Sequence, residues 1–120
     1  MPVTAKSLDR PDDTRNFPNG KGTIVKVDSL EVGRGVLEPG WRWSNDSKPM
    51  AGTASCEVQH TRLVLAGQFH VEMNDGSAAD LVEGDVYVIP PGHDAWVVGE
   101  SQLVSVDWSR HISELARPAS

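Results

Sequence analysis

Glycine and proline interrupt this chain at short intervals, and this spacing restricts its fold more than any other feature. The 120 residues include 11 Gly and 8 Pro, which separate apolar runs too short for helices of ordinary length. Asn74-Asp75-Gly76 is a strong hairpin signal, because these residue types tolerate the positive φ values of tight turns. Short, closely spaced strands predict one all-β domain, built as a sandwich or a barrel.

The chain divides into an arm, a barrel and a tail. We expect an N-terminal arm at 1–22, a barrel at 23–108 and a C-terminal tail at 109–120. A short helix is predicted at 109–116, because serines are available to cap it and Pro118 would end it. The expected strands are 23–28, 30–37, 41–44, 56–66, 68–73, 79–82, 86–90, 94–98 and 102–108.

Charge and cysteine content exclude several classes of protein. Eleven Lys and Arg against 17 Asp and Glu leave a net charge of −6, which argues against a nucleic-acid partner. No apolar stretch approaches the roughly 20 residues of a membrane span. The single cysteine, Cys56, and an N-terminus without an apolar leader segment indicate a reducing compartment, which we expect to be the cytoplasm.

One motif resembles a known superfamily. Gly84, Pro90 and Gly92 have the spacing of the second motif of the cupins, in which five residues separate the first glycine from the proline. Residues 63–67, which read Leu-Val-Leu-Ala-Gly, are similar to the strand end of the first cupin motif. The resemblance covers residues 30–108. It implies a double-stranded β-helix, which is a jelly-roll barrel, with a pocket at one mouth.

The resemblance also implies a metal site, yet the standard ligands of that site are missing. Cupins use two His and a Glu from the first motif, and these positions are Ala54, Cys56 and His60 in this chain. The position of the second-motif His is occupied by Ala95. The usual ligand set therefore cannot be carried over to this sequence.

A different metal site is one alternative. Strand alternation places Cys56, His60, Arg62 and Val64 on one face, which the resemblance turns inward. With His93, Cys56 and His60 would hold a divalent metal such as zinc and leave one position open. The charge of Arg62 opposes a dication there. Cys56 as a small buried hydrophobe and His60 as a hydrogen-bonded core histidine are the alternatives.

Tryptophan is unusually frequent, since it supplies four of the seven aromatic residues. Trp41 and Trp43 share one face of the expected strand and Arg42 takes the other, so the two indoles are candidates for the wall of a small-molecule pocket. Trp96 is out of phase with Ala95 and should face away from the barrel interior. Ordinary core or interface packing is the alternative for each indole.

Three functions remain open. The first is a module that binds a small aromatic or anionic molecule in a barrel pocket formed by Trp41, Trp43, Arg62, Val64 and His93. The second is a small metal-dependent enzyme of isomerase, lyase or oxygenase type that uses the Cys/His set. The third is a dimeric barrel with a sensing or structural role. A homodimer is the expected assembly, and the fold alone does not choose among these functions.

Overall fold

Two antiparallel sheets form the fold in the computed structural model, which describes residues 2–46, 48 and 60–109. The larger sheet has the strand order β1-β2-β3-β9-β4-β7, and the smaller sheet has the order β6-β5-β8. The elements are β1 (Asp13–Phe17), β2 (Gly20–Val27), β3 (Leu30–Leu37), α1 (Trp43–Asp46), β4 (His60–Ala66), β5 (Gln68–Met73), β6 (Ala78–Val82), β7 (Val86–Ile89), β8 (His93–Val98) and β9 (Leu103–Ser109).

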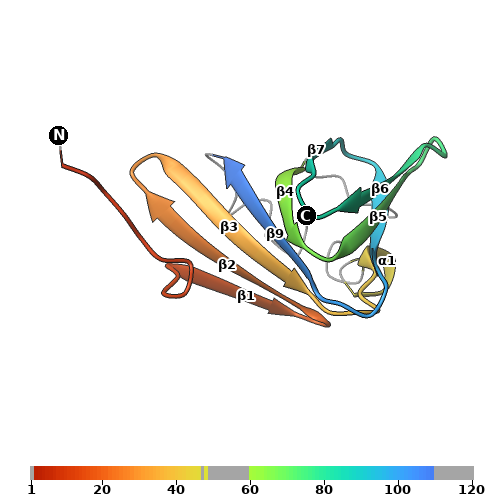
Figure 1. Ribbon diagram of the computed structural model, residues 1–120, viewed down its shortest axis with the longest axis horizontal. Coiled ribbons are helices and arrows are strands. Elements are labelled where there is room, and N and C mark those ends of the chain that lie inside the picture. Colours follow the sequence, from red (N-terminus) through yellow and green to blue (C-terminus); the bar gives the residue numbers. More distant parts are fainter. Residues whose placement is uncertain (1, 47, 49–59, 110–120) are drawn as a thin grey trace.

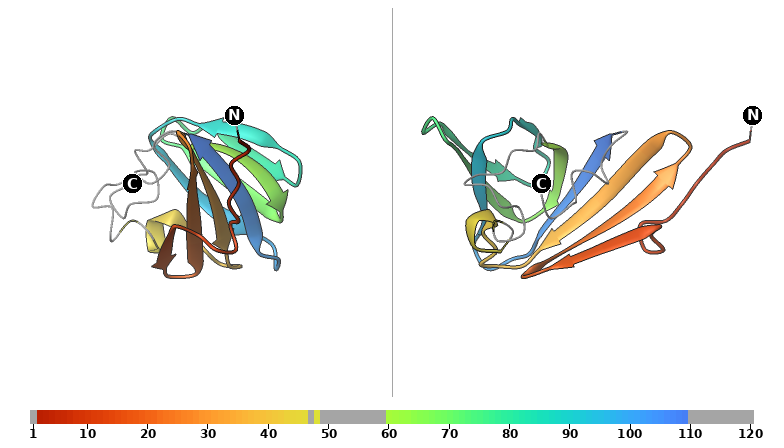
Figure 2. Two further views of the ribbon diagram at one scale, coloured as in Figure 1. Left: turned by 90° about the vertical axis from the view of Figure 1, so that its left-hand side faces the viewer. Right: turned by 180° about the vertical axis from the view of Figure 1, so that it is seen from behind.

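The two sheets curve toward each other over β4–β8, and the first three strands extend away from this curved part (Figure 1). The same arrangement is visible from behind in Figure 2, where the N-terminus lies at the far end of the extended strands. The predicted jelly-roll architecture is confirmed. Within the described part of the chain, no helix has the length and apolar character needed to cross a bilayer.

Most predicted strands are present. Those at 30–37 and 68–73 coincide with β3 and β5, and most of the others differ from the observed bounds by one to three residues. The predicted strand at 56–66 is described only from His60 onward, as β4. The predicted C-terminal helix lies outside the described residues except for Ser109, which belongs to β9.

One predicted strand is absent. Residues 41–44 do not form a strand, because α1 begins at Trp43, where the Asp46 carboxylate accepts a hydrogen bond from the Arg42 amide at 2.9 Å. Polar side chains that bond the local backbone in this way favour turns over strands. Within the segment 1–22, which we assigned to an arm, the structure has β1 and the start of β2. The Pro18-Asn19 turn, with Asn19 at φ 59°, joins β1 to β2 as an antiparallel pair.

The core fills one end of the barrel and draws on both sheets. Its largest side chains below 2% exposure are Ile24, Val64 and Leu103. Inward positions of paired strands supply most of the cluster, as cross-strand partners share a face. The main cluster consists of Leu37, Trp41, Trp43, Val64, Phe69, Val71, Tyr87, Ile89, Ala95, Val97 and Leu103.

Candidate functional site

Beside the core, polar side chains from β4, β7 and β9 face the barrel interior, and one of them, Tyr87, also belongs to the core cluster. Arg62 on β4 lies directly opposite Tyr87 on β7 and Asp107 on β9, so all three point to the same face. Ser105 lies two residues before Asp107 and pairs with Val64, which places its hydroxyl on that face as well. We call Arg62, Tyr87, Ser105 and Asp107 the polar wall.

An ion pair forms the centre of the polar wall. Arg62 Nε lies 2.6 Å from Asp107 Oδ1, and the two side chains are only 19% and 15% exposed. Burial raises the pKa of Asp107 above its ordinary value, and the neighbouring guanidinium opposes this rise. The pair therefore holds a carboxyl group that takes up a proton more readily than an exposed aspartate does.

Tyr87 and Ser105 complete the polar wall and are almost fully buried. Burial raises the pKa of Tyr87 above its ordinary value. The phenolic oxygen makes no hydrogen bond of good geometry with the described residues, although Arg62 and Ser105 lie close enough to oppose the rise in its pKa. A buried hydroxyl in this condition is a ready partner for a polar ligand atom.

His93 lies on the smaller sheet, where it pairs with Met73 at the start of β8. Its side chain is buried, and Nδ1 lies 2.7 Å from the carbonyl oxygen of Pro90. A carbonyl oxygen only accepts, so Nδ1 is the donor and the neutral ring carries its lone pair on Nε2. The Pro90-Pro91-Gly92 turn therefore sets both the orientation and the tautomer of this histidine.

Glycines flank the polar wall on the β3 side. Gly33 pairs with Asp107, and Gly35 pairs with Ser105. A Cβ atom added at Gly35 would meet only Ser105 Oγ, at an ordinary contact distance of 3.5 Å. Because neither position carries a side chain, β3 places only backbone beside the polar wall.

The predicted pocket residues divide between the two ends of the interior. Arg62 belongs to the polar wall, whereas Val64 is 1% exposed and lies in the core. Trp41 also lies in the core, with its ring centroid 6.1 Å from that of Phe69. Trp43 is buried at the start of α1, which contacts the strand that carries His93.

The structure agrees with the predicted orientations of Trp96 and Arg42. Trp96 faces away from the interior, with its ring 4.4 Å from that of His70. The Arg42 guanidinium lies 4.0 Å above the Trp96 indole. Arg42 therefore lies on the outer side, whereas the neighbouring Trp41 and Trp43 are buried on the inner side. This stack fixes α1 to the outside of β8.

The described residues do not make a metal site. No three His, Cys, Asp or Glu side chains among them group closely enough to hold an ion, and Ala95 supplies no ligand. Of the predicted Cys56, His60 and His93 set, only the His93 side chain belongs to the described part. That ligand set stays a prediction.

The sequence alone did not indicate Tyr87, Ser105 or Asp107. The available signal was the alternation along 103–108, where Leu103, Ser105 and Asp107 share one face. Alternation identifies residues on a common face but does not say which face is inward. The more apolar set, with Val104 and Val106, turns outward here.

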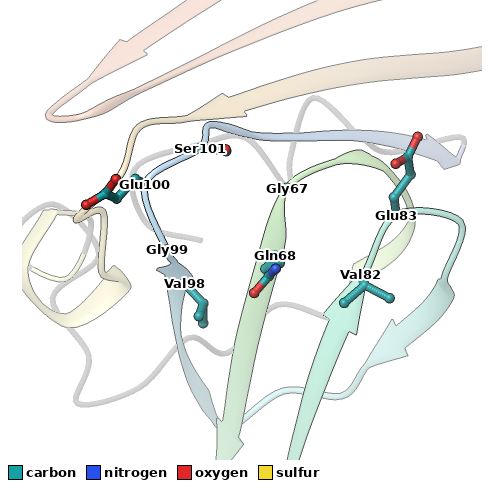
Figure 3. A pocket seen from close by; sticks show the side chains of 8 residues that line it. All are labelled: Gly67, Gln68, Val82, Glu83, Val98, Gly99, Glu100 and Ser101. Atoms are coloured by element: carbon teal, nitrogen blue, oxygen red, sulfur yellow. The ribbon is translucent and has the colours of Figure 1, made fainter.

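A separate depression of about 390 Å³ lies at the end of the smaller sheet. Figure 3 shows Glu83 and Glu100 on opposite sides of it, with Gln68, Val82 and Val98 between them. These side chains include two carboxylates and no aromatic, His or Arg residue, so the depression lacks the groups of a catalytic or anion-binding site. The polar wall is the better candidate.

Comparison with known proteins informs the fold. No family model and no curated protein sequence matches the chain. Ectoine synthase from P. lautus superposes with a TM-score of 0.65 at 11% identity, over 88% of this chain and 76% of the other. Oxalate decarboxylase from Lactobacillus farciminis gives 0.57 at 18% identity over 80% of this chain, which spans 30% of that longer protein. A cupin-like protein from Thermotoga maritima gives 0.53 at 22% identity, over 78% and 70%. These likenesses concern the fold alone.

Proposed function

We propose that this chain, which has the cupin fold, binds a small carboxylate-bearing or aromatic molecule at the polar end of its barrel. The observation that carries the proposal is the polar wall, whose four side chains turn into the interior. Burying such groups costs free energy, and the core shows that the same strands also accept apolar residues. A ligand that contacts the polar wall would account for the presence of these buried polar side chains.

Arg62 is the anchor in this proposal. A guanidinium is planar and forms paired hydrogen bonds with carboxylate groups. A ligand carboxylate would add a second anion beside Asp107. The raised pKa of Asp107 favours proton uptake at that moment, so Asp107 would become a donor to the ligand instead of repelling it.

The apolar body of the ligand would rest against residues that surround the polar wall. Met73 pairs with His93, and Ile89 follows Tyr87 on the inner face of β7. Trp43 lies at the start of the helix that packs on β8. Gly33 and Gly35 leave room for a flat group on the β3 side.

A matched pair of probes tests the anionic group. Benzoate should shift the amide NMR resonances of Arg62, Tyr87 and His93, whereas its neutral isostere benzamide should bind at least about tenfold more weakly, as expected for loss of a charge-assisted hydrogen bond. Malonate and phenylacetate test the size and the aromatic character. Absence of any shift at these residues across the panel would contradict the proposal.

Substitutions test whether benzoate binds at the polar wall. Arg62→Met should weaken benzoate binding about tenfold or more, while Arg34→Met, which removes an ion-paired arginine from the opposite face of the same sheet, should leave it unchanged. Gly35→Val should weaken binding by filling the space beside Ser105 and should not unfold the protein, because its Cβ meets only an ordinary contact. Equal effects of Arg62→Met and Arg34→Met would argue against the site.

The hydrogen bond from His93 to Pro90 favours a second candidate, a metal-dependent enzyme that uses the predicted Cys/His set, because second-shell bonds of this kind orient metal-binding histidines. Metal analysis of protein purified without an affinity tag separates the two proposals. Near-stoichiometric zinc that is lost in Cys56→Ala supports the enzyme. Benzoate binding that persists in a chelator, with little metal present, supports the binding module.

A further inference from the structure

The outward face of the larger sheet is unusually apolar. Four neighbouring strands, β3, β9, β4 and β7, present twelve described outward positions, and none of these carries a carboxylate. The two polar exceptions are Thr61 and Arg34. The apolar positions are Leu30, Val32, Val36, Leu63, Leu65, Val86, Val88, Val104, Val106 and Trp108.

The outward face of the smaller sheet has a different composition. An antiparallel sheet with one solvated face normally alternates apolar-in with polar-out, and this sheet largely follows the rule. Its outward positions are Gln68, His70, Glu72, Ala78, Asp80, Val82, Asp94, Trp96 and Val98. The apolar face of the larger sheet is therefore not a general property of this protein's surface.

Part of the larger face is covered within the chain, and part is open. At β2, Thr23 and Val25 are only 8% and 3% exposed, beside the point where Asp9 of the N-terminal segment pairs with Arg34 at 2.8 Å. At the other side, Val86 is 66% and Val88 is 57% exposed. We call the apolar outward residues of β9, β4 and β7 the open face; they are Leu63, Leu65, Val86, Val88, Val104, Val106 and Trp108.

Charge indicates what can cover the open face. The chain carries a net charge of −6, so two copies repel each other over most of their surface. The open face has no carboxylate, and the nearby Arg34 is already paired with Asp9. Two copies therefore meet with least repulsion at this face. A flat apolar surface is also complementary to its own two-fold image.

The size of the face matches a modest dimer. The open face spans three strands about 4.8 Å apart, of which β9 and β4 have seven residues and β7 has four. At about 3.3 Å per residue, they give a flat footprint of roughly 290 Å² per copy. Two copies together cover roughly 600 Å² before side chains are counted, which is the size of a weak, transient interface. We propose that the chain forms a two-fold symmetric homodimer through the open face, with Trp108 and the two exposed valines of β7 as its main contacts.

Sedimentation velocity over about 1 µM to about 500 µM, a range that brackets the affinity of small interfaces, tests the dimer. Wild type should shift from monomer to dimer within this range. Val86→Glu and Val88→Glu place a carboxylate on the open face of each copy and should weaken association at least about 100-fold. Both positions are more than half exposed, so the monomer should remain folded.

Matched controls lie on the smaller sheet. Val82→Glu and Val98→Glu change valines that are 49% and 36% exposed and should leave the dimer intact. A wild type that is monomeric at every concentration overturns the proposal, and so does a dimer lost in Val82→Glu but kept in Val86→Glu. If the β7 variants fail to fold, Leu65→Lys, at a position 43% exposed, provides the same test from β4.

Discussion

The two ends of the barrel interior differ sharply, although the same strands line both. On β4, Arg62 and Val64 are two residues apart, and on β9, Asp107 and Leu103 are four apart. One end is a packed apolar core with Leu103 fully buried. The other end holds an ion pair and hydroxyl groups. Inward orientation therefore does not mean apolar packing, because the inward face has an apolar part and a polar part.

The largest expected effect concerns the packed half. Leu103→Ala should lower the free energy of unfolding by about 3–4 kcal/mol, since a fully buried leucine leaves a cavity when truncated. Urea denaturation measures this loss. Val86→Ala, at an exposed position, should change it by no more than about 0.5 kcal/mol. If the two substitutions cost the same, the contrast between a packed core and its surroundings is wrong.

A second, intermediate effect compares two arginine–aspartate pairs on opposite faces of one sheet. Burial raises the pKa of Asp107, so its folded state binds more protons than the unfolded state. Its contribution to stability is complete below the unfolded pKa and is lost as pH rises through the raised folded pKa. Asp107→Asn should therefore gain stability relative to wild type as pH rises from about 3.5 toward 7, within the ordinary titration range of a raised carboxyl.

Asp9 supplies the control with the opposite sign. Its hydrogen bond to Arg34 lowers the pKa of that exposed carboxyl, so its contribution to stability is present above the unfolded pKa and is lost as pH falls through the lowered folded pKa. Asp9→Asn should lose stability relative to wild type as pH rises. Urea unfolding of wild type and of both variants across this pH range measures how the free energy of unfolding of each variant changes relative to wild type. Parallel pH trends would show that the interior pair behaves like a surface pair.

The smallest effect at neutral pH is expected at Tyr87. Tyr87→Phe should change stability by no more than about 1 kcal/mol, because the hydroxyl makes no well-formed bond among the described residues. Burial raises the pKa of Tyr87, so wild type should lose stability above pH 10 while the variant is spared. Tyr87 is the only tyrosine, and tyrosinate absorbance reports it directly. Titration of the native protein at the ordinary pKa would contradict this assignment.

Much of the fold was predictable, because turn residues mark the ends of strands locally. The Gly84, Pro90 and Gly92 spacing indicated the jelly roll, and the strands at 30–37 and 68–73 were predicted at their observed bounds. The turn at Trp43 was not predictable from alternation, since it depends on side-chain bonds to the local backbone.

The candidate site was predictable only in part. Arg62 and His93 were identified from the sequence, but Asp107 becomes the partner of Arg62 only through the pairing of β4 with β9. These residues are 45 positions apart in the sequence, and no local sequence pattern predicts which residues of two such distant strands pair with each other. The inward position of Ser105 and Asp107 on β9 was also not predictable. Alternation with the usual preference for apolar residues inside would have placed Val104 and Val106 in the interior instead.

Strands β4 and β9 each present one side to the polar wall and the other to the open face. Arg62 and Leu63 are neighbours in sequence, as are Asp107 and Val106. In each pair, the two side chains lie on opposite faces of the sheet. A shift of the backbone that improves contact on one side therefore moves the residues on the other side. The two proposals therefore predict linked equilibria: a ligand that changed the affinity of the dimer would, by reciprocity, have its own affinity changed by the same factor.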